Sequence, residues 1–323
     1  MKNGPRSAAA PVRRPKNCWT GTASPNNPWT SSCASGRWDA AEGIERTMAD
    51  RKGQIEAAAK TVRRVFGSFP RIAIVAGSGL GAIANYLTDS GSLAYSAIPG
   101  LPVSTVVGHA GELICGKLEG RRVAVFSGRK HLYEGASVDD AVLSIRLMAR
   151  FGVKYIILSN AAGGISKYLR PGDLMLISDF INVSNRKLLR FQSSNRRRLN
   201  QRACLQPVVC DPFLMDLARS VAISERIPLK EGIYCVCSGP TYETKSEVKL
   251  YNLSGADAVG MSTVPEITEA YRLGLKTLAI SCITNSHVHG DTKTTHAEVI
   301  EVAKQVEDRF VRLVCHVVAR LRP

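Results

Sequence analysis

The sequence has no long hydrophobic run, because Arg, Lys, Asp or Gly interrupts every apolar stretch. A membrane-spanning helix needs roughly 18 or more consecutive apolar residues. The sequence also has no Cys-x-x-Cys pair, and its 9 cysteines are scattered, which argues against a disulfide framework and a zinc site. We therefore expect a protein with no membrane segment and no bound metal, located in the reducing cytoplasm.

Acidic residues are scarce in two segments, which carry most of the formal net charge of +16. Residues 1–64 hold twelve Lys and Arg against five acids, and residues 186–202 hold seven basic residues and no acid. One interpretation is a nucleic-acid groove, but Phe191 is the only aromatic residue in the second segment that could stack on a base. We favour solvated appendages, so nucleic acid is not an expected partner.

Residues 1–52 show no hydrophobic periodicity and are rich in Pro, Ser and Asn. Such a segment cannot bury a continuous face, so we predict a disordered basic extension there. The pattern changes after it, and the 45% hydrophobic content of the chain is typical of a folded protein. We predict a single α/β domain over residues 53–323.

Short apolar segments alternate with helical ones through this domain. The predicted strands cover residues 72–76, 123–127, 155–159, 174–181, 233–237, 256–260 and 277–283. The predicted helices cover residues 54–67, 79–87, 137–151, 213–226, 244–254, 264–273 and 296–321. This alternation predicts a central mixed, largely parallel sheet flanked by helices, whose ligands bind beyond the carboxyl ends of the strands.

The first motif, Gly77–Ala82, lies where a predicted strand ends and a helix begins. Backbone N–H groups, a helix N-terminus and the Ser78 hydroxyl would meet there, which favours an anion site. The same residues satisfy a dinucleotide-binding fingerprint, but positions 94–102 lack the acidic residue that this fingerprint requires. A tight turn that merely needs small residues is the simplest alternative.

Two further motifs also follow strands. In Ser127–Gly135, the side chains of Arg129, His131 and Tyr133 alternate onto one face if the segment is extended, where they could bind phosphate and cover a sugar. A solvated basic turn is the alternative. Ser159–Gly164 ends in small residues that let a ligand approach the backbone closely, although alone it is only a turn signal.

The last three motifs carry aromatic, carboxylate and amide groups. In Ser238–Thr244, Tyr242 and Glu243 could stack on a planar ring and accept its N–H, or a Thr could simply cap the next helix. Val259–Glu266 places a hydroxyl at a strand end before a helix. The pair Thr284 and Asn285 closes the last strand; His296 heads the terminal helix and could be an ordinary helical residue.

Taken in this order, the segments GSGLG, VVGHAGEL, GRKHLYEG, SNAAGGI, GPTYET and AVGMSTVPE resemble the trimeric purine nucleoside phosphorylases, a family that includes methylthioadenosine phosphorylase. The resemblance runs from about residue 54 to about residue 320. It implies a phosphate site, a ribose site, a base site and a histidine near the phosphate entrance. These would be Ser78, Arg129, His131, the Ala161 N–H and Ser262 for phosphate; Tyr133, Met261 and His296 for ribose; Tyr242, Glu243, Val259, Thr284 and Asn285 for the base; and His109 at the entrance.

The resemblance implies phosphate-dependent cleavage of purine nucleosides by a homotrimer, with inorganic phosphate as co-substrate and no cofactor. Asn285, Glu243 and His109 would be the catalytic residues. An amide at position 285 favours inosine and guanosine over 6-aminopurine nucleosides. Two alternatives stay open: a methylthioadenosine phosphorylase, and a non-catalytic, nucleic-acid-binding relative of the same fold.

Two segments depart from the family's pattern. Relatives carry an aromatic residue that reaches a neighbouring subunit's ribose, but in residues 185–213 only Phe191 and Phe213 are aromatic, and neither can be assigned that role. In residues 286–295 two histidines, His287 and His289, resemble a metal-binding pair. We expect both to be solvated, as isolated histidines in a polar loop usually are.

Overall fold

The computed structural model describes residues 40–104, 110–184, 209–288 and 295–322, and their side chains from residue 51 onward except that of His296. The chain divides into two units, Met1–Arg46 and Thr47–Pro323, and the fold described here is that of the second. None of the described helices is long and apolar enough to cross a lipid bilayer.

A nine-stranded mixed sheet runs through the second unit in the order β2-β3-β4-β1-β5-β8-β7-β6-β9. Strand β5 also pairs with β9, so the last five strands in this order close on themselves. The strands are β1 (Ile72–Ala76), β2 (Thr88–Ala94), β3 (Glu112–Leu118), β4 (Arg121–Ser127), β5 (Tyr155–Gly164), β6 (Leu174–Asn182), β7 (Leu229–Val236), β8 (Ala258–Gly260) and β9 (Lys276–Ser286).

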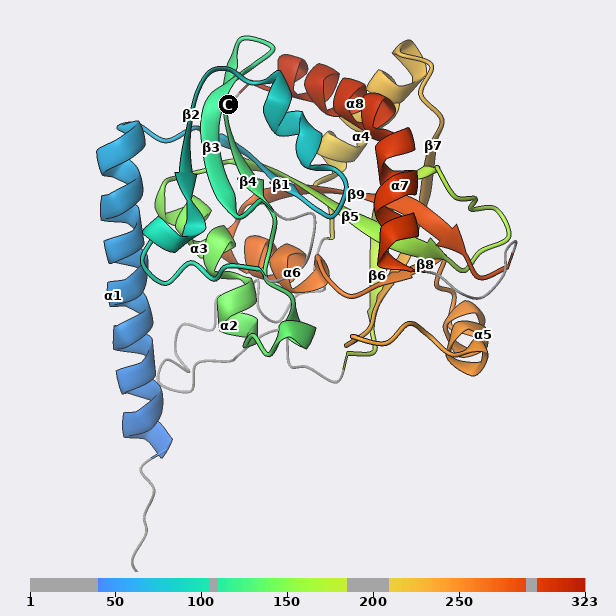
Figure 1. Ribbon diagram of the computed structural model, residues 1–323, viewed down its shortest axis with the longest axis horizontal. Coiled ribbons are helices and arrows are strands. Elements are labelled where there is room, and N and C mark those ends of the chain that lie inside the picture. Colours follow the sequence, from blue (N-terminus) through green and yellow to red (C-terminus); the bar gives the residue numbers. More distant parts are fainter. Residues whose placement is uncertain (1–39, 105–109, 185–208, 289–294, 323) are drawn as a thin grey trace, which may run out of the picture. The chain divides into compact units, whose positions relative to one another are not determined.

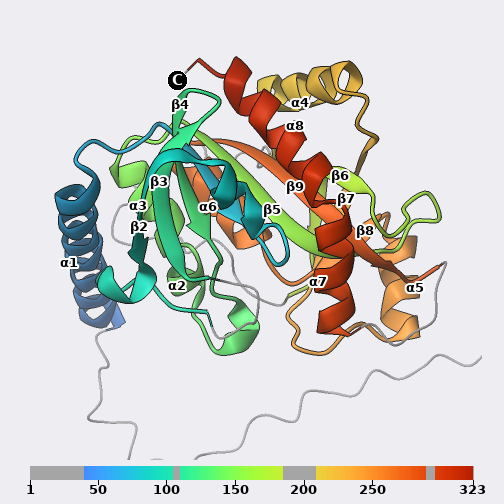
Figure 2. The same ribbon diagram turned by 45° about the horizontal axis from the view of Figure 1, so that its top comes forward.

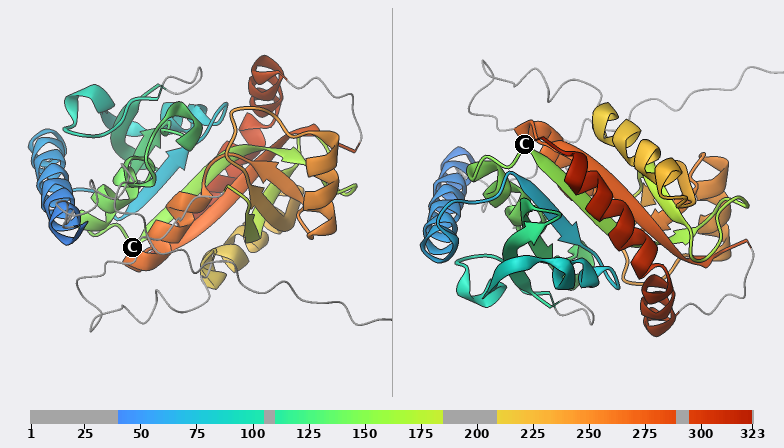
Figure 3. Two further views of the ribbon diagram at one scale, coloured as in Figure 1. Left: turned by 90° about the horizontal axis from the view of Figure 1, so that it is seen from below. Right: turned by 90° about the horizontal axis from the view of Figure 1, so that it is seen from above.

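Helices cover both faces of this sheet (Figure 1). The described helices are α1 (Ala40–Phe66), of which the part from Thr47 belongs to this unit, α2 (Val138–Ala141), α3 (Leu143–Arg150), α4 (Pro212–Ser224), α5 (Lys245–Leu253), α6 (Val264–Leu273), α7 (His296–Gln305) and α8 (Glu307–Arg320). Helices α4 and α8 pack together on one face, and α3 and α6 pack together on the other (Figure 3). The predicted mixed sheet flanked by helices is therefore confirmed.

Strand register brings the sequence motifs to one edge of the sheet. Parallel strands β1 and β4 end in register, Ala76 opposite Ser127, so the motifs after them are neighbours. Strand β5 places Gly163 opposite Val259 of β8 and Asn285 of β9. Strand β5 lies between β1 and β9, which pair with its two edges (Figure 2). Groups far apart in the sequence therefore meet at the carboxyl ends of these strands.

Several predicted helices have different bounds. Helix α1 begins at Ala40, fourteen residues before the predicted start and within the segment expected to be disordered; residues 1–39 lie outside the described residues. The predicted helix 79–87 is a short 3₁₀ helix, Gly81–Tyr86, after Gly79 takes the left-handed conformation with φ +73°. Predicted helices 137–151 and 296–321 each divide in two, at Val142 and Val306, whose ψ angles near 0° interrupt the helical repeat.

Strands β2 and β3 were not predicted. Strand β2 reads TDSGSLA and is almost entirely exposed, so it lacks the apolar alternation from which a strand is recognised. It forms at the sheet's edge because its backbone pairs with β3, over Gly91–Ala94 opposite Glu112–Cys115. Such pairing depends on a distant partner and leaves little trace in the local sequence.

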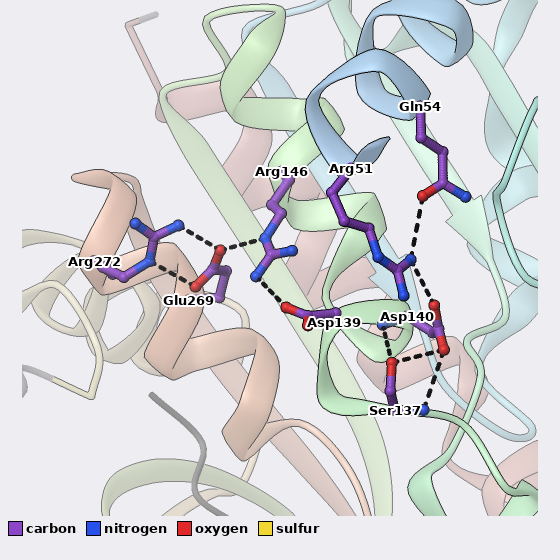
Figure 4. Close-up of polar contacts among 8 residues, drawn as sticks. All are labelled: Arg51, Gln54, Ser137, Asp139, Asp140, Arg146, Glu269 and Arg272. Atoms are coloured by element: carbon purple, nitrogen blue, oxygen red, sulfur yellow. Dashed lines mark hydrogen bonds and ion pairs between the residues drawn. The ribbon is translucent and has the colours of Figure 1, made fainter. Parts of the chain in front are cut away.

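A buried carboxylate joins α3 to α6. Glu269 Oε1 accepts from Arg146 Nε and Arg272 Nη2, each at 2.6 Å, and the side chain of Glu269 is 5% exposed (Figure 4). Burial disfavours the charged form, but the two guanidinium groups hold the pKa of Glu269 below its usual value. Because its folded-state pKa is lowered, Glu269 stabilises the fold above the ordinary glutamate pKa and loses this effect as pH falls.

Replacement of Glu269 by Gln should lower the free energy of unfolding at neutral pH by about 1.5–3 kcal/mol, since charge-assisted hydrogen bonds are lost. The loss should shrink in acid, where the native carboxylate also protonates. Urea unfolding at several pH values measures it. Glu231→Gln is the matched control: Glu231 pairs with Arg219 in an exposed ion pair, and such pairs contribute about 0–1 kcal/mol. Equal losses in both variants would contradict the prediction.

Candidate active site

A cavity of about 100 Å³ lies at the carboxyl ends of β1, β4, β5, β8 and β9. Residues from six separate sequence motifs line it. Among them are twelve of the residues singled out from the sequence: Ser78, Arg129, His131, Tyr133, Ala161, Tyr242, Glu243, Val259, Met261, Ser262, Thr284 and Asn285. The motifs therefore converge on one small space, as the order of strands requires.

Two predicted residues are not placed in the cavity. His109 lies outside the described residues. His296 begins α7, but its side chain is not among those described. Of the two aromatics in the divergent segment, Phe191 is also outside the described residues, and Phe213 sits on α4 with its ring 5.9 Å from the Lys276 ammonium. Phe213 does not line the cavity.

Arg129 is held in the cavity wall by several hydrogen bonds. Its Nη2 donates to the backbone carbonyls of Ser159, at 2.6 Å, and Val75, at 3.3 Å. Its Nη1 donates to Thr263 Oγ1, at 2.8 Å, and lies 3.4 Å from Ser262 Oγ. The guanidinium is buried yet borders the cavity, so a positive charge with a fixed orientation faces the space inside. This arrangement suits an oxyanion.

Glu266, which the sequence analysis did not single out, contacts Arg129 but does not line the cavity. Its Oε2 is 3.2 Å from Arg129 Nη1, and both side chains are almost fully buried. Burial raises the pKa of Glu266, although the adjacent guanidinium opposes the shift. The charged form of Glu266, which compensates the charge of Arg129, therefore depends on the guanidinium beside it.

The backbone at Thr263 is strained. Its φ and ψ are 69° and −45°, a region that β-branched residues rarely adopt, and Val264 N–H donates to Ser262 O at 2.7 Å across the turn. Bonds from Arg129 and from Asn160 Nδ2, at 2.9 Å, hold Thr263 Oγ1 in place. Ser262, the residue before this turn, lines the cavity, and strained turns of this kind are found at functional sites.

His131 is oriented by a neighbouring carboxylate. Its ring Nδ1 lies 2.9 Å from Glu134 Oε1, and its backbone N–H donates to the same oxygen at 2.8 Å. Because a carboxylate only accepts, Nδ1 carries a proton. The ring also stacks on Tyr133, with centroids 4.8 Å apart. The imidazole is thus fixed in the cavity wall beside Arg129.

Glycines allow the closest approaches around the cavity. A Cβ on Gly77 would lie 2.5 Å from Ser159 O, so only glycine lets the turn after β1 touch β5. Gly239 has φ +64°, and a Cβ there would lie 2.4 Å from Met261 Sδ and 3.1 Å from the Tyr133 ring. Tyr133 and Met261 therefore pack against the turn that precedes Tyr242.

The cavity is also lined by a carboxylate and an amide, those of Glu243 and Asn285. The Glu243 side chain is 5% exposed; its Oε1 accepts from Cys237 Sγ at 3.1 Å, and its Oε2 lies 3.5 Å from His287 Nε2. Thr284 Oγ1 donates to Asn285 Oδ1 at 3.2 Å, which leaves the Asn285 amide nitrogen to act as a donor. A donor and an acceptor thus line the same cavity as Arg129.

The prediction of a solvated histidine pair was wrong for His287. Its side chain is 16% exposed, lines the cavity and faces Glu243. His289 lies outside the described residues. Within the described part of the chain, no group of three or more His, Cys, Asp or Glu side chains is arranged to hold a metal ion. Sequence reasoning did not assign a role in the site to four residues: Asn160, Thr263, Glu266 and His287. Each of them acts through a contact that the local sequence does not show.

A strand-end cavity lined by a fixed guanidinium, a carboxylate and an amide is typical of enzymes that hold an anion beside a polar ring. The sequence profile of the Phosphorylase superfamily matches residues 71–319. The chain belongs to this superfamily and, within it, to the purine nucleoside phosphorylases, as relatives more than 30% identical over most of their length establish.

Purine nucleoside phosphorylase 1 of Geobacillus stearothermophilus is 41% identical over 269 residues, which are 83% of this chain and 97% of the relative. Purine nucleoside phosphorylase of Bos taurus is 37% identical, over 78% of this chain and 89% of the relative. The crystal structure of the Schistosoma mansoni enzyme in complex with adenosine superposes with a TM-score of 0.74 at 32% identity, over 84% of this chain and 98% of that one.

Proposed function

We propose that this chain cleaves the N-glycosidic bond of purine ribonucleosides and deoxyribonucleosides with inorganic phosphate, preferring inosine and guanosine. The products are the free base and ribose 1-phosphate or deoxyribose 1-phosphate. The observation that carries this proposal is that Arg129, Ser262, Glu243 and Asn285 line one and the same cavity. Schistosoma purine nucleoside phosphorylases have been crystallised with inosine, with guanosine and with adenosine. The substrate preference of this chain is therefore argued from its own residues and not from family membership.

In this proposal, one end of the cavity binds phosphate. The ligands are Arg129, His131, the hydroxyls of Ser78 and Ser262, and the Ala161 N–H. A phosphate dianion is already nucleophilic, so it needs alignment under the anomeric carbon and no strong base. As the glycosidic bond lengthens, the ribose becomes cationic, and at about 4 Å the anion stabilises it by roughly 4 kcal/mol at an effective dielectric constant of 20. Phosphate therefore acts both as nucleophile and as counter-charge.

Tyr133 and Met261, which pack against the Gly239 turn, would cover the ribose. His296 would lie near the 5′-hydroxyl of the ribose. His109 would stand near the phosphate entrance. Tyr242 and Val259 would contact the faces of the purine, and Thr284 would orient Asn285 through the hydrogen bond described above. No cofactor enters this scheme.

The departing purine becomes anionic, so donors aimed at it act mainly in the transition state. Asn285 Nδ2 would donate to N7. Glu243 would accept the N1–H that 6-oxopurines carry; in free adenosine, N1 is an acceptor. Although burial opposes it, contacts from His287 and Cys237 hold the pKa of Glu243 below its usual value, so the group stays a carboxylate at neutral pH. This charge state supports the preference for inosine and guanosine.

A phosphate-dependent assay with inosine, guanosine, adenosine and methylthioadenosine tests the proposal. We expect cleavage of inosine and guanosine that requires phosphate and releases sugar 1-phosphate. Preferential cleavage of methylthioadenosine would assign the alternative activity. Absence of cleavage of all four, combined with salt-sensitive binding to nucleic acid, would support a non-catalytic relative instead.

We also propose that the enzyme is a homotrimer in the cytoplasm. The described cysteines, Cys115, Cys210, Cys235, Cys237, Cys282 and Cys315, are all free thiols, as a reducing compartment would keep them. Light scattering should give three times the chain mass of 34.9 kDa. A mass of one or two chains would rule out the trimer.

A further inference from the structure

His287 occupies a defined position at the base end of the cavity. It directly follows β9, and its backbone N–H donates to Gly164 O at 2.9 Å, which continues the pairing of β5 with β9. The imidazole is mostly buried, and its Nε2 lies 3.5 Å from Glu243 Oε2. The contact is therefore set by the sheet and not by the polar segment that follows.

Gly163 makes room for this imidazole. A Cβ at position 163 would lie 2.9 Å from His287 Nε2 and 3.1 Å from Asn285 Nδ2, so the two nitrogen atoms lie beside the same point. Strand pairing places Gly163 opposite Asn285. His287 thus stands next to both groups that would grasp the base, the amide of Asn285 and the carboxylate of Glu243.

Each oxygen of the Glu243 carboxylate has its own neighbour. Cys237 Sγ contacts Oε1, and His287 Nε2 faces Oε2. Burial and the adjacent carboxylate raise the pKa of the Cys237 thiol, so this group stays a neutral donor. Further out, the carboxylate acts electrostatically on Tyr242, Cys235, Glu247 and Tyr251. Among these neighbours, His287 is the one whose ring nitrogen faces Oε2.

We propose that His287 is a positioning residue that sets base specificity, because its Nε2–H holds the Glu243 carboxylate ionised and oriented for the N1–H of a 6-oxopurine. This inference rests on the proposed function and refines it. A 6-aminopurine presents a lone pair at N1, which a carboxylate repels, whereas a protonated Glu243 would donate to it. Fixing the charge of Glu243 therefore discriminates between the two classes of base.

Removal of His287 would leave burial as the main influence on Glu243. Burial favours the neutral acid, and the contact with His287 opposes it. Without this contact, Glu243 should protonate at a higher pH. Inosine cleavage should then fail at a higher pH, while adenosine, which the neutral acid can accommodate, should suffer less.

The test compares His287→Ala, His287→Gln and wild-type enzyme in phosphate-dependent cleavage of inosine and adenosine across a range of pH. In His287→Ala, KM for inosine should rise roughly three- to tenfold, with kcat little changed, the size expected for the loss of one polar contact to Glu243. The acid limb of kcat/KM for inosine should move to higher pH, and the ratio of inosine to adenosine cleavage should fall in acid. His287→Gln, which keeps a neutral donor, should restore much of the KM.

His316→Ala is the matched control, because His316 pairs with Glu225 on the surface through a contact of 3.2 Å and is 43% exposed. It should leave both profiles unchanged. An unaltered acid limb and base ratio in His287→Ala would overturn the inference, as would a Gln variant no better than Ala. If the wild-type enzyme cleaves no nucleoside, the proposed function itself fails, so the two failures are distinguishable.

Discussion

Replacement of Arg129 by Ala is expected to reduce kcat/KM for phosphate by roughly 10²- to 10⁴-fold. Because the Nη hydrogens of Arg129 already bond to the protein, the guanidinium would act on the phosphate dianion mainly through its charge, which is worth about 4 kcal/mol for unit charges about 4 Å apart at an effective dielectric constant of 20. Its backbone and Thr263 contacts fix the fork before phosphate arrives, so no ordering is needed on binding. Initial rates at varied phosphate concentration, with saturating inosine, measure the loss.

The same substitution should destabilise the fold, because it leaves the Glu266 carboxylate buried without a counter-ion. Loss of one partner of a buried pair costs about 3–5 kcal/mol. Burial already raises the pKa of Glu266, and removal of Arg129 removes the opposing influence. A group whose folded-state pKa is raised destabilises the fold as pH rises. The stability deficit of Arg129→Ala should therefore grow from acid to neutral pH.

A double variant separates the two effects. Arg129→Ala with Glu266→Gln removes both charges, so it should recover most of the lost Tm without recovering activity. Arg129→Lys keeps the charge but loses the planar fork, and should fall between wild type and Ala in phosphate affinity. Normal phosphate kinetics in the folded double variant would show that Arg129 does not bind the substrate.

The sequence was sufficient for most of the sheet because its central strands are short, apolar and β-branched. Strand β1 was predicted with its observed bounds, Ile72–Ala76, and all five of its residues are buried. Strand β2 escaped prediction because its exposed, glycine-containing sequence pairs only through the backbone. The split of the last helix at Val306 escaped too, since valine there carries no stop signal and the break is seen only in its dihedral angles.

The candidate site could be predicted to the extent that its groups follow strands. Ser78 and Arg129 come just after β1 and β4, which are parallel neighbours, so the topology alone brings them together. Glu266 and His287 act through distant partners, Arg129 and Glu243, and nothing within a few residues of either reveals these contacts. The contact of His287 depends on the register of β9 against β5, because a shift of β9 by one residue would turn His287 away from the cavity.

Asn285→Asp should lower kcat/KM for inosine by roughly 10²- to 10³-fold, since one donor aimed at transition-state charge contributes about 2.7–4 kcal/mol. A carboxylate at this position cannot donate to N7 and would repel the developing purine anion. It can, however, accept a 6-amino N–H, so adenosine cleavage should fall less and the preference should shift toward adenosine. The Thr284 hydroxyl can still donate to an Asp oxygen, so the fold should be retained.

Steady-state rates with inosine and adenosine at saturating phosphate measure the Asn285 prediction. Asn252→Asp, an equivalent change at an exposed position of α5, is the matched control and should leave both rates unchanged. Unchanged inosine selectivity in Asn285→Asp would refute the role assigned to the amide. Because His287 and Asn285 flank the same glycine, His287→Ala combined with Asn285→Asp should depart from additivity, as neighbouring side chains do. Additive losses would show that the two side chains act independently.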